Sequence, residues 1–93
     1  MKSIKMFISG NIKGSGFGLF SLTLAERYGI TGYMEYSRNG TVIIKAEGQI
    51  NNVNKFINSC IKGNQRSRID LVRIESDCIN NYTKFKLQNF NVY

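Results

Sequence analysis

The first thirty residues change from the apolar period of a strand to that of a helix. Residues 3–10 alternate, with Phe7 on one face and three apolar side chains on the other: Ile4, Met6 and Ile8. In residues 17–28 the apolar side chains recur at intervals of three and four, which is typical of a helix with one buried side: Phe17, Phe20, Leu24 and Tyr28. Gly29 follows at the position where glycine commonly ends a helix. The chain therefore begins with a strand, a glycine-rich connection and a helix.

The middle of the chain predicts a hairpin and a second helix. Two β-leaning runs, residues 32–37 and 41–47, are joined through Arg38-Asn39-Gly40, and Asn-Gly is a strong hairpin signal. After Gly48, six apolar residues fall on one helical stripe: Ile50, Val53, Phe56, Ile57, Cys60 and Ile61. Lys62 and Gly63 then supply a basic last turn and a glycine stop.

Two further strands complete the predicted order of elements. Four apolar residues suggest the first of these strands: Ile69, Leu71, Val72 and Ile74. Phe85 and Leu87 flank Lys86 in a short final strand. The order βαββαβ plus a short C-terminal strand matches an α+β, ferredoxin-like sandwich, with an antiparallel sheet and two helices on one face. This fold hosts many unrelated functions, so function has to be argued from a site.

Length and composition predict one globular domain. The chain has 93 residues, of which 42% are hydrophobic and 20% charged, so we expect a single domain over residues 1–93 that folds alone. The first ten residues hold only a broken apolar run, too short for a signal sequence or a membrane span. We therefore expect a cytoplasmic monomer without membrane contact.

The cysteines predict no metal or redox chemistry. Cys60 and Cys78 share none of the spacings of a zinc site or a redox pair, and histidine is absent. We therefore expect no metal and no other cofactor. Cys60 falls on the apolar stripe of the second helix and is interpreted as a small buried hydrophobe. A disulfide between the two cysteines stays open at this stage.

The formal charge of +7 favours an anionic partner without identifying it. Phosphate, acidic protein and nucleic acid all fit. A basic cluster could follow a phosphate backbone, although a solvated face is the interpretation we favour: Lys62, Arg66, Arg68 and Arg73. Residues 16–20 superficially resemble the aromatic strand of RNA-recognition domains, but they open a helix, so Phe17 and Phe20 are expected in the core. Nucleic acid remains a disfavoured alternative.

One stretch carries a chemical signature, the glycine-rich connection over residues 10–18. Glycines let the backbone turn so that several N–H groups converge, and the start of a helix adds further donors and a partial positive charge. Such a loop can bind a small phosphate or carboxylate anion, although a purely structural turn also needs glycines. The predicted anion-binding residues are Lys13, Gly14, Ser15, Gly16, Phe17 and Gly18.

This stretch resembles the signature of the acylphosphatase family, Gly-x-Val-Gln-Gly-Val-Gly-Phe-Arg. Gly10, Gly14, Gly16 and Phe17 match it, and Ile12 replaces valine. The resemblance continues through several further segments and covers roughly residues 5–88: Leu19-Phe20-Ser21-Leu22, Ala25, Tyr28-Gly29-Ile30-Thr31-Gly32-Tyr33, Gly40-Thr41-Val42, Ala46-Glu47-Gly48, Lys62-Gly63 and Phe85-Lys86-Leu87. It implies metal-independent hydrolysis of acyl phosphates.

Two departures affect the residues on which that hydrolysis depends. The family's arginine grips the substrate phosphate and its asparagine orients the attacking water, and counting without gaps puts Gly18 and Tyr36 at these positions. Loss of one positioned donor typically costs about 10² to 10³ in rate. We assign no catalytic residue and expect anion binding with weak or absent hydrolysis. The alternative is a slow acylphosphatase in which Lys13 or Arg38 supplies the missing cation.

Overall fold

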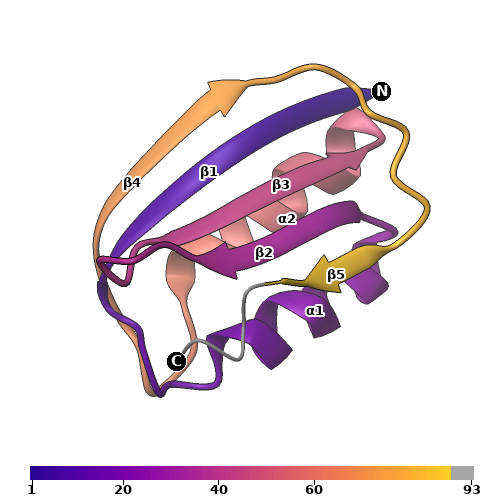
Figure 1. Cartoon of the computed structure of the whole chain (residues 1–93). Coiled ribbons are helices and arrows are strands. Elements are labelled where there is room, and N and C mark those ends of the chain that lie inside the picture. The colour runs from indigo at the N-terminus through magenta and orange to yellow at the C-terminus, as the bar shows by residue number, and fades with distance from the viewer. Residues whose placement is uncertain (89–93) are drawn as a thin grey trace.

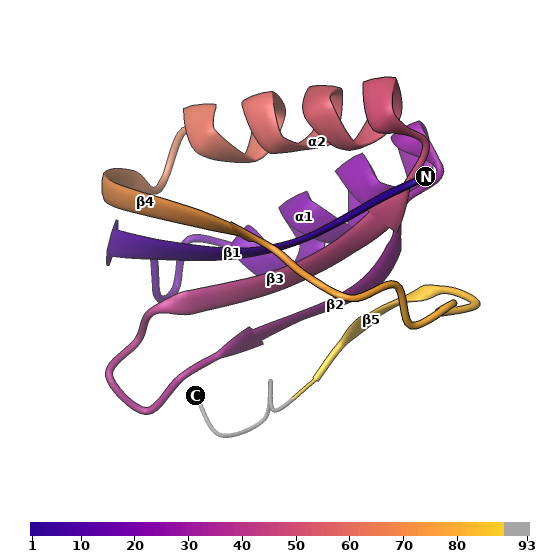
Figure 2. The same cartoon turned by 90° about the horizontal axis from the view of Figure 1, so that it is seen from above.

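The computed structural model describes residues 1–88, which form two helices and one five-stranded sheet (Figure 1). In chain order the elements are β1 (Lys2–Asn11), α1 (Phe17–Tyr28), β2 (Thr31–Tyr36), β3 (Val42–Gly48), α2 (Ile50–Lys62), β4 (Arg68–Ser76) and β5 (Phe85–Leu87). The strands lie in the order β4-β1-β3-β2-β5. Both helices cover the same face of the sheet (Figure 2). The α+β, ferredoxin-like prediction is confirmed.

The predicted antiparallel sheet needs one correction. The first four strands pair antiparallel, but β5 pairs parallel with β2, through Gly32 opposite Phe85 and Met34 opposite Leu87. The sheet is therefore mixed. The Lys84 carbonyl accepts from the Gly32 N–H at 3.0 Å, and the Gln88 N–H donates to the Met34 carbonyl at 2.9 Å. These bonds extend the pairing beyond the three residues of β5.

The core lies between the sheet and the two helices. Alternate residues of β1 and β3 face the helices and are buried: Ile4, Met6, Ile8, Val42, Ile44 and Ala46. Helix α1 contributes Phe17, Leu24 and Ala25 to this core. Helix α2 contributes Cys60, a free thiol whose pKa is raised to about 12 by burial. The interpretation of Cys60 as a small buried hydrophobe is confirmed.

The apolar stripe of α2 is narrower than the sequence predicts. Four of its six members are buried: Val53, Phe56, Ile57 and Cys60. Ile50 and Ile61, at the two ends of the helix, remain 54% and 37% exposed. Helical spacing places residues on a face, but the extent of the sheet beneath that face decides how many of them are covered.

The face of the sheet opposite the helices is partly covered by the chain between β4 and β5. In this segment the Asp77 carboxylate accepts a hydrogen bond from the Lys45 Nζ at 2.7 Å. The Asn80 backbone N–H donates to the Glu47 carboxylate. Lys45 and Glu47 are therefore buried even though they lie on the helix-free face. The part of this face near the β2–β3 turn remains open.

Candidate anion site at the glycine loop

The loop between β1 and α1 is a tight turn shaped by two glycines. Gly14 and Gly16 have φ of +80° and +77°, the left-handed conformation that glycine adopts without strain. The Ser15 N–H donates to the Ile12 carbonyl at 3.0 Å and closes the turn. Ile12 is itself buried, so its side chain attaches the loop to the core. The backbone on both sides of Ser15 is thereby presented at the surface.

Helix α1 begins at this turn without a side-chain cap. Gly16 occupies the N-cap position and makes no side-chain cap hydrogen bond, and no acidic residue lies in the first turn. The first N–H groups of a helix have no intrahelical acceptor, and the helix dipole adds a partial positive charge there. A small anion can satisfy both.

Ser15 is the unusual side chain of the loop. The residue is only 5% exposed, and among the described residues its hydroxyl has no hydrogen-bond partner. Its carbonyl accepts a bond from the Asn64 Nδ2 at 2.9 Å, so the α2–β4 loop braces the glycine loop. A buried hydroxyl without a partner carries a desolvation cost of about 1–3 kcal/mol. The hydroxyl oxygen is closed off from solvent, so a ligand can accept its proton and remove this cost only when the loop shifts.

The six residues predicted to bind an anion divide by exposure. Lys13, Gly14 and Gly16 are exposed, whereas Ser15, Phe17 and Gly18 are buried. Phe17 is fully buried, and its ring centroid lies 5.3 Å from that of Phe20, which is partly buried and packs against the core. Both aromatics therefore belong to a helix that packs on the sheet, and the sheet surface does not display them as an RNA-recognition strand would.

Gly18 and Tyr36 both lie close to the core. Gly18 is buried in the first turn of α1. Tyr36 ends β2 on the helix-facing side, is 6% exposed, and has its pKa raised by burial. The position that resembles the family's asparagine is thus filled by a large side chain packed into the core.

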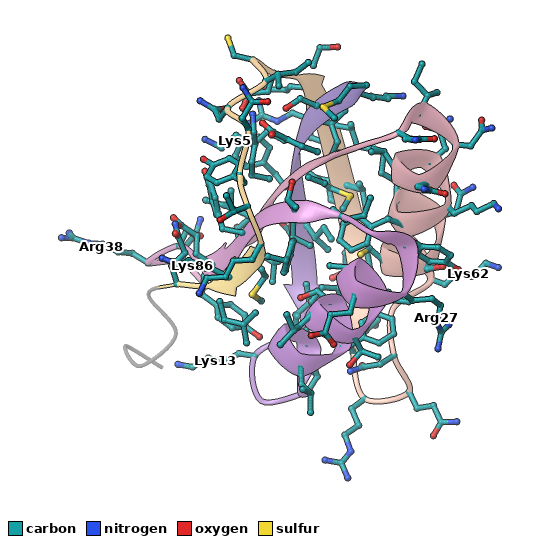
Figure 3. The ribbon with its side chains drawn as sticks, turned by 90° about the vertical axis from the view of Figure 1, so that its right-hand side faces the viewer. Lys5, Lys13, Arg27, Arg38, Lys62 and Lys86 are labelled. Carbon is teal, nitrogen blue, oxygen red and sulfur yellow. The ribbon has the colours of Figure 1, made fainter. Side chains whose placement is uncertain are left out.

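The two candidate replacement cations project from different segments. Lys13 is exposed on the glycine loop, and Arg38 is exposed in the β2–β3 turn. Strand pairing stops at Tyr36, opposite Val42, so Arg38 does not share the buried face of Tyr36. Figure 3 shows Lys13 and Arg38 on the same side of the molecule, away from Arg27 and Lys62 on the helix side.

A hollow of about 200 Å³ separates the glycine loop from the β2–β3 turn. Residues 9–13 line one wall, and residues 39–41 line the other. Lys13 is the only charged residue among them, whereas Arg38 does not line this hollow. Sequence reasoning missed this juxtaposition because the two segments are almost thirty residues apart and meet only through the pairing of β1 with β3.

The basic cluster predicted from sequence is dispersed. Arg68 pairs with Asp70 at 3.2 Å, and Arg73 pairs with Glu75 at 3.3 Å. Lys62 lies at the end of α2, on the other side of the molecule from the open sheet face (Figure 3). Within residues 1–88 no helix is long and apolar enough to cross a membrane. The same residues contain no group of three acidic or cysteine side chains that could hold a metal ion.

Comparisons with known proteins point to one family. The family model described as acylphosphatase matches residues 4–87. An acylphosphatase of Thermotoga petrophila is 30% identical over 90 residues, covering 97% of this chain and 100% of the relative. One of Clostridium acetobutylicum is 35% identical over 81 residues, or 86% and 89% of the two chains. The crystal structure of the Bacillus subtilis acylphosphatase superposes with a TM-score of 0.90 at 22% identity, covering 94% and 98%. The chain belongs to the acylphosphatase family.

Proposed function

We propose that this family member binds a small phosphate or carboxylate anion at the glycine loop and hydrolyses acyl phosphates weakly or not at all. The observation that carries the proposal is the uncapped start of α1 beside the buried hydroxyl of Ser15, which has no hydrogen-bond partner within residues 1–88. Backbone N–H groups and a hydroxyl recognise an oxyanion without any guanidinium. Binding can therefore persist where the family's arginine is missing.

The expected loss of hydrolysis follows from the chemistry at Gly18 and Tyr36. A guanidinium grips two phosphate oxygens at once, and glycine has no side chain to do so. The phenol of Tyr36 is packed into the core, where it lacks the short reach of an amide toward an attacking water. We expect each loss to slow hydrolysis by about 10² to 10³.

A slow genuine acylphosphatase is the second candidate, and the position of Lys13 is the observation that supports it. Lys13 lines the hollow beside the glycine loop, so its ammonium can approach a bound phosphate. Arg38 is outside that hollow, which makes Lys13 the better of the two replacement cations. A lysine provides a single point charge in place of the planar fork of arginine, so turnover should stay low.

Hydrolysis of benzoyl phosphate by the purified chain tests the proposal. We expect the native chain to be near the uncatalysed rate, the Gly18→Arg variant to gain activity, and the Gly18→Arg, Tyr36→Asn double variant to gain more. Because Tyr36 is buried, thermal unfolding of each variant shows first that it is folded at the assay temperature. Efficient turnover by the native chain would overturn the proposal, and Lys13→Met would then show whether Lys13 supplies the cation.

A further inference from the structure

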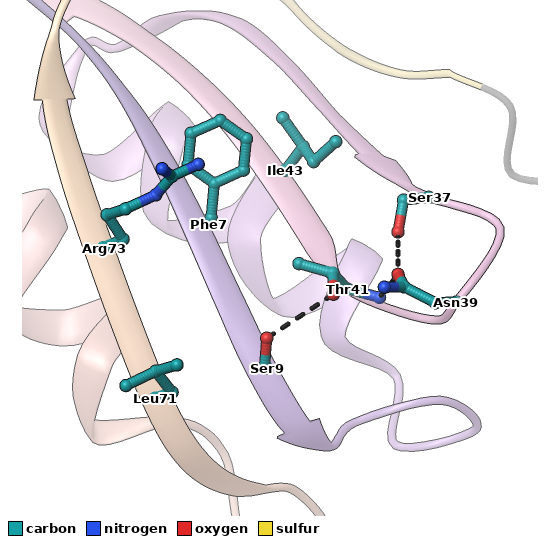
Figure 4. A pocket seen from close by; sticks show the side chains of 8 residues that line it. All are labelled: Phe7, Ser9, Ser37, Asn39, Thr41, Ile43, Leu71 and Arg73. Atoms are coloured by element: carbon teal, nitrogen blue, oxygen red, sulfur yellow. Dashed lines mark hydrogen bonds between the residues drawn. The ribbon is translucent and has the colours of Figure 1, made fainter.

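A second hollow lies on the open face of the sheet, next to the glycine loop. It measures about 400 Å³ and is lined by the C-terminal half of β1, the start of β3, the middle of β4 and the β2–β3 turn (Figure 4). Three of its lining residues, Ser9, Asn39 and Thr41, also line the smaller hollow that contains Lys13. The two hollows therefore adjoin each other.

The two halves of the larger hollow differ in chemistry. On one side Phe7, Ile43 and Leu71 present apolar surface, and Leu71 is 68% exposed. On the other side lie hydroxyl and amide groups, as Figure 4 shows: Ser9, Ser37, Asn39 and Thr41. The hydroxyls of Ser9 and Thr41 lie 3.4 Å apart, and the Ser37 hydroxyl donates to the Asn39 Oδ1. The polar side is the one that leads toward Lys13.

Among the residues that the structure describes, Arg73 is the only charged one that lines this hollow. Its guanidinium carbon lies 4.4 Å from the centroid of the Phe7 ring, so the cation stacks over the aromatic face. A planar guanidinium on a ring offers a flat surface for a second planar group, and it attracts negative charge. Arg73 also pairs with Glu75 at 3.3 Å, which offsets part of its charge, but among residues 1–88 no acidic side chain lines the hollow itself. The hollow therefore suits an anion that has a flat apolar body.

We propose that the hollow binds the flat apolar part of a small aromatic acid, with the acid group directed toward Lys13 and the glycine loop. This inference rests on the proposed function, because it places the ligand's phosphate or carboxylate in the anion site described above. It makes aromatic acyl phosphates and aromatic carboxylates the ligand class. Short aliphatic acids contact the polar side alone and bind more weakly.

Titrations followed by the amide NMR signals of the ¹⁵N-labelled native chain test this assignment. Benzoate should shift the signals of Phe7, Ile43 and Leu71, and acetate should bind at least about tenfold more weakly because it buries no ring. Inorganic phosphate should shift Gly14 and Gly16 instead. Benzoate shifts confined to the loop, or equal binding of acetate and benzoate, would overturn the inference.

A pair of variants with equal charge separates the hollow from general electrostatics. Leu71→Glu puts a carboxylate at the hollow, whereas Ile50→Glu adds the same charge at the start of α2, also at an exposed apolar residue. We expect Leu71→Glu to weaken benzoate binding about tenfold or more and Ile50→Glu to leave it unchanged. Equal effects of the two variants would contradict the assignment.

The same titrations distinguish failure of this inference from failure of the proposed function. If phosphate shifts the loop signals but benzoate never reaches Phe7, Ile43 and Leu71, the hollow is not a subsite and the anion site stands. If benzoate occupies the hollow but phosphate leaves Gly14 and Gly16 unmoved, the proposed anion site is wrong. Shifts from both ligands in their expected places support both.

Discussion

Lys45 and Glu47 are buried charges on a face of the sheet where charges are usually solvated. They are 1% and 2% exposed, and the Lys45 Nζ lies 3.7 Å from the Glu47 Oε2. Lys45 also donates to the carbonyl of Cys78 at 2.6 Å and to the Asp77 carboxylate. A buried ion pair is tolerated only when its remaining donors and acceptors are satisfied. The segment after β4 supplies these partners, which is why it crosses this part of the sheet.

Asp77 should make stability depend on pH in the acid range. Its pKa is lowered, chiefly by the hydrogen bond from Lys45 and then by that from the Cys78 N–H. Because the folded-state pKa lies below the unfolded value, the stabilisation is complete above the unfolded pKa of about 3.9 and is lost as pH falls through the folded pKa. We expect Asp77→Asn to lower the free energy of unfolding at pH 7, and we expect its difference from the native chain to shrink as pH falls through the folded pKa of Asp77.

Urea unfolding at several pH values measures this difference. Asp70→Asn is the control, because the Asp70 carboxylate pairs with Arg68 on the exposed surface and such pairs contribute little. If the difference in free energy of unfolding between the native chain and Asp77→Asn stays constant from pH 7 to pH 2, the pH dependence does not come from Asp77.

At the scale of elements, the junction between β1 and the glycine loop depends on a close approach of the β1 backbone to the β4 backbone. The register between β1 and β4 shifts between Ser9 and Gly10. Gly10 has φ of +152°, and a Cβ there would lie 2.0 Å from the carbonyl oxygen of Arg68. Gly14 also has a positive φ, but a Cβ there meets nothing within 4 Å. The two glycines are therefore required for different reasons.

Alanine substitutions at Gly10 and Gly14 should lower the free energy of unfolding by different amounts. Gly14→Ala adds only the strain of a left-handed residue, which we expect to lower it by about 1–2 kcal/mol. Gly10→Ala adds a clash with backbone that cannot move aside without breaking the β1–β4 pairing, so we expect about 3 kcal/mol or more, or loss of cooperative folding. Urea unfolding measures both free energies, and equal losses would show that the junction between β1 and the glycine loop can relax around the added Cβ.

The elements that sequence predicts best are those with local stop signals. The bounds of α1 and α2 follow from apolar spacing and from Gly29 and Gly63 at their ends. The parallel pairing of β5 is not predictable this way, because a three-residue strand carries no signal for its partner. The larger hollow was missed for a similar reason. Phe7 falls on the second face of β1 and Leu71 interrupts the apolar alternation of β4, but only the sheet order brings them together.

Across the whole molecule, the positive charge is spread over both sides of the sheet. Lys5, Lys13, Arg38 and Lys86 lie on the side of the open sheet face, and Arg27 and Lys62 lie on the helix side (Figure 3). The formal charge of +7 therefore does not form one continuous stripe. It attracts anions of every kind over long range, and under the proposed function the selectivity for a small anion would come from the glycine loop and its adjoining hollows.

This distribution predicts weak, salt-sensitive binding of nucleic acid. A protein that follows a single strand needs a continuous basic groove and several exposed aromatic rings, whereas here the Phe7 ring is stacked under Arg73. Any complex should therefore rest on scattered phosphate contacts, and these lose affinity steeply between about 50 and 200 mM salt. Fluorescence anisotropy with a labelled single-stranded RNA should detect binding at the lower salt concentration and little at the higher one. A complex that survives the higher salt concentration and is lost in Phe7→Ala would show that the open sheet face reads nucleic acid, against the small-anion site we favour.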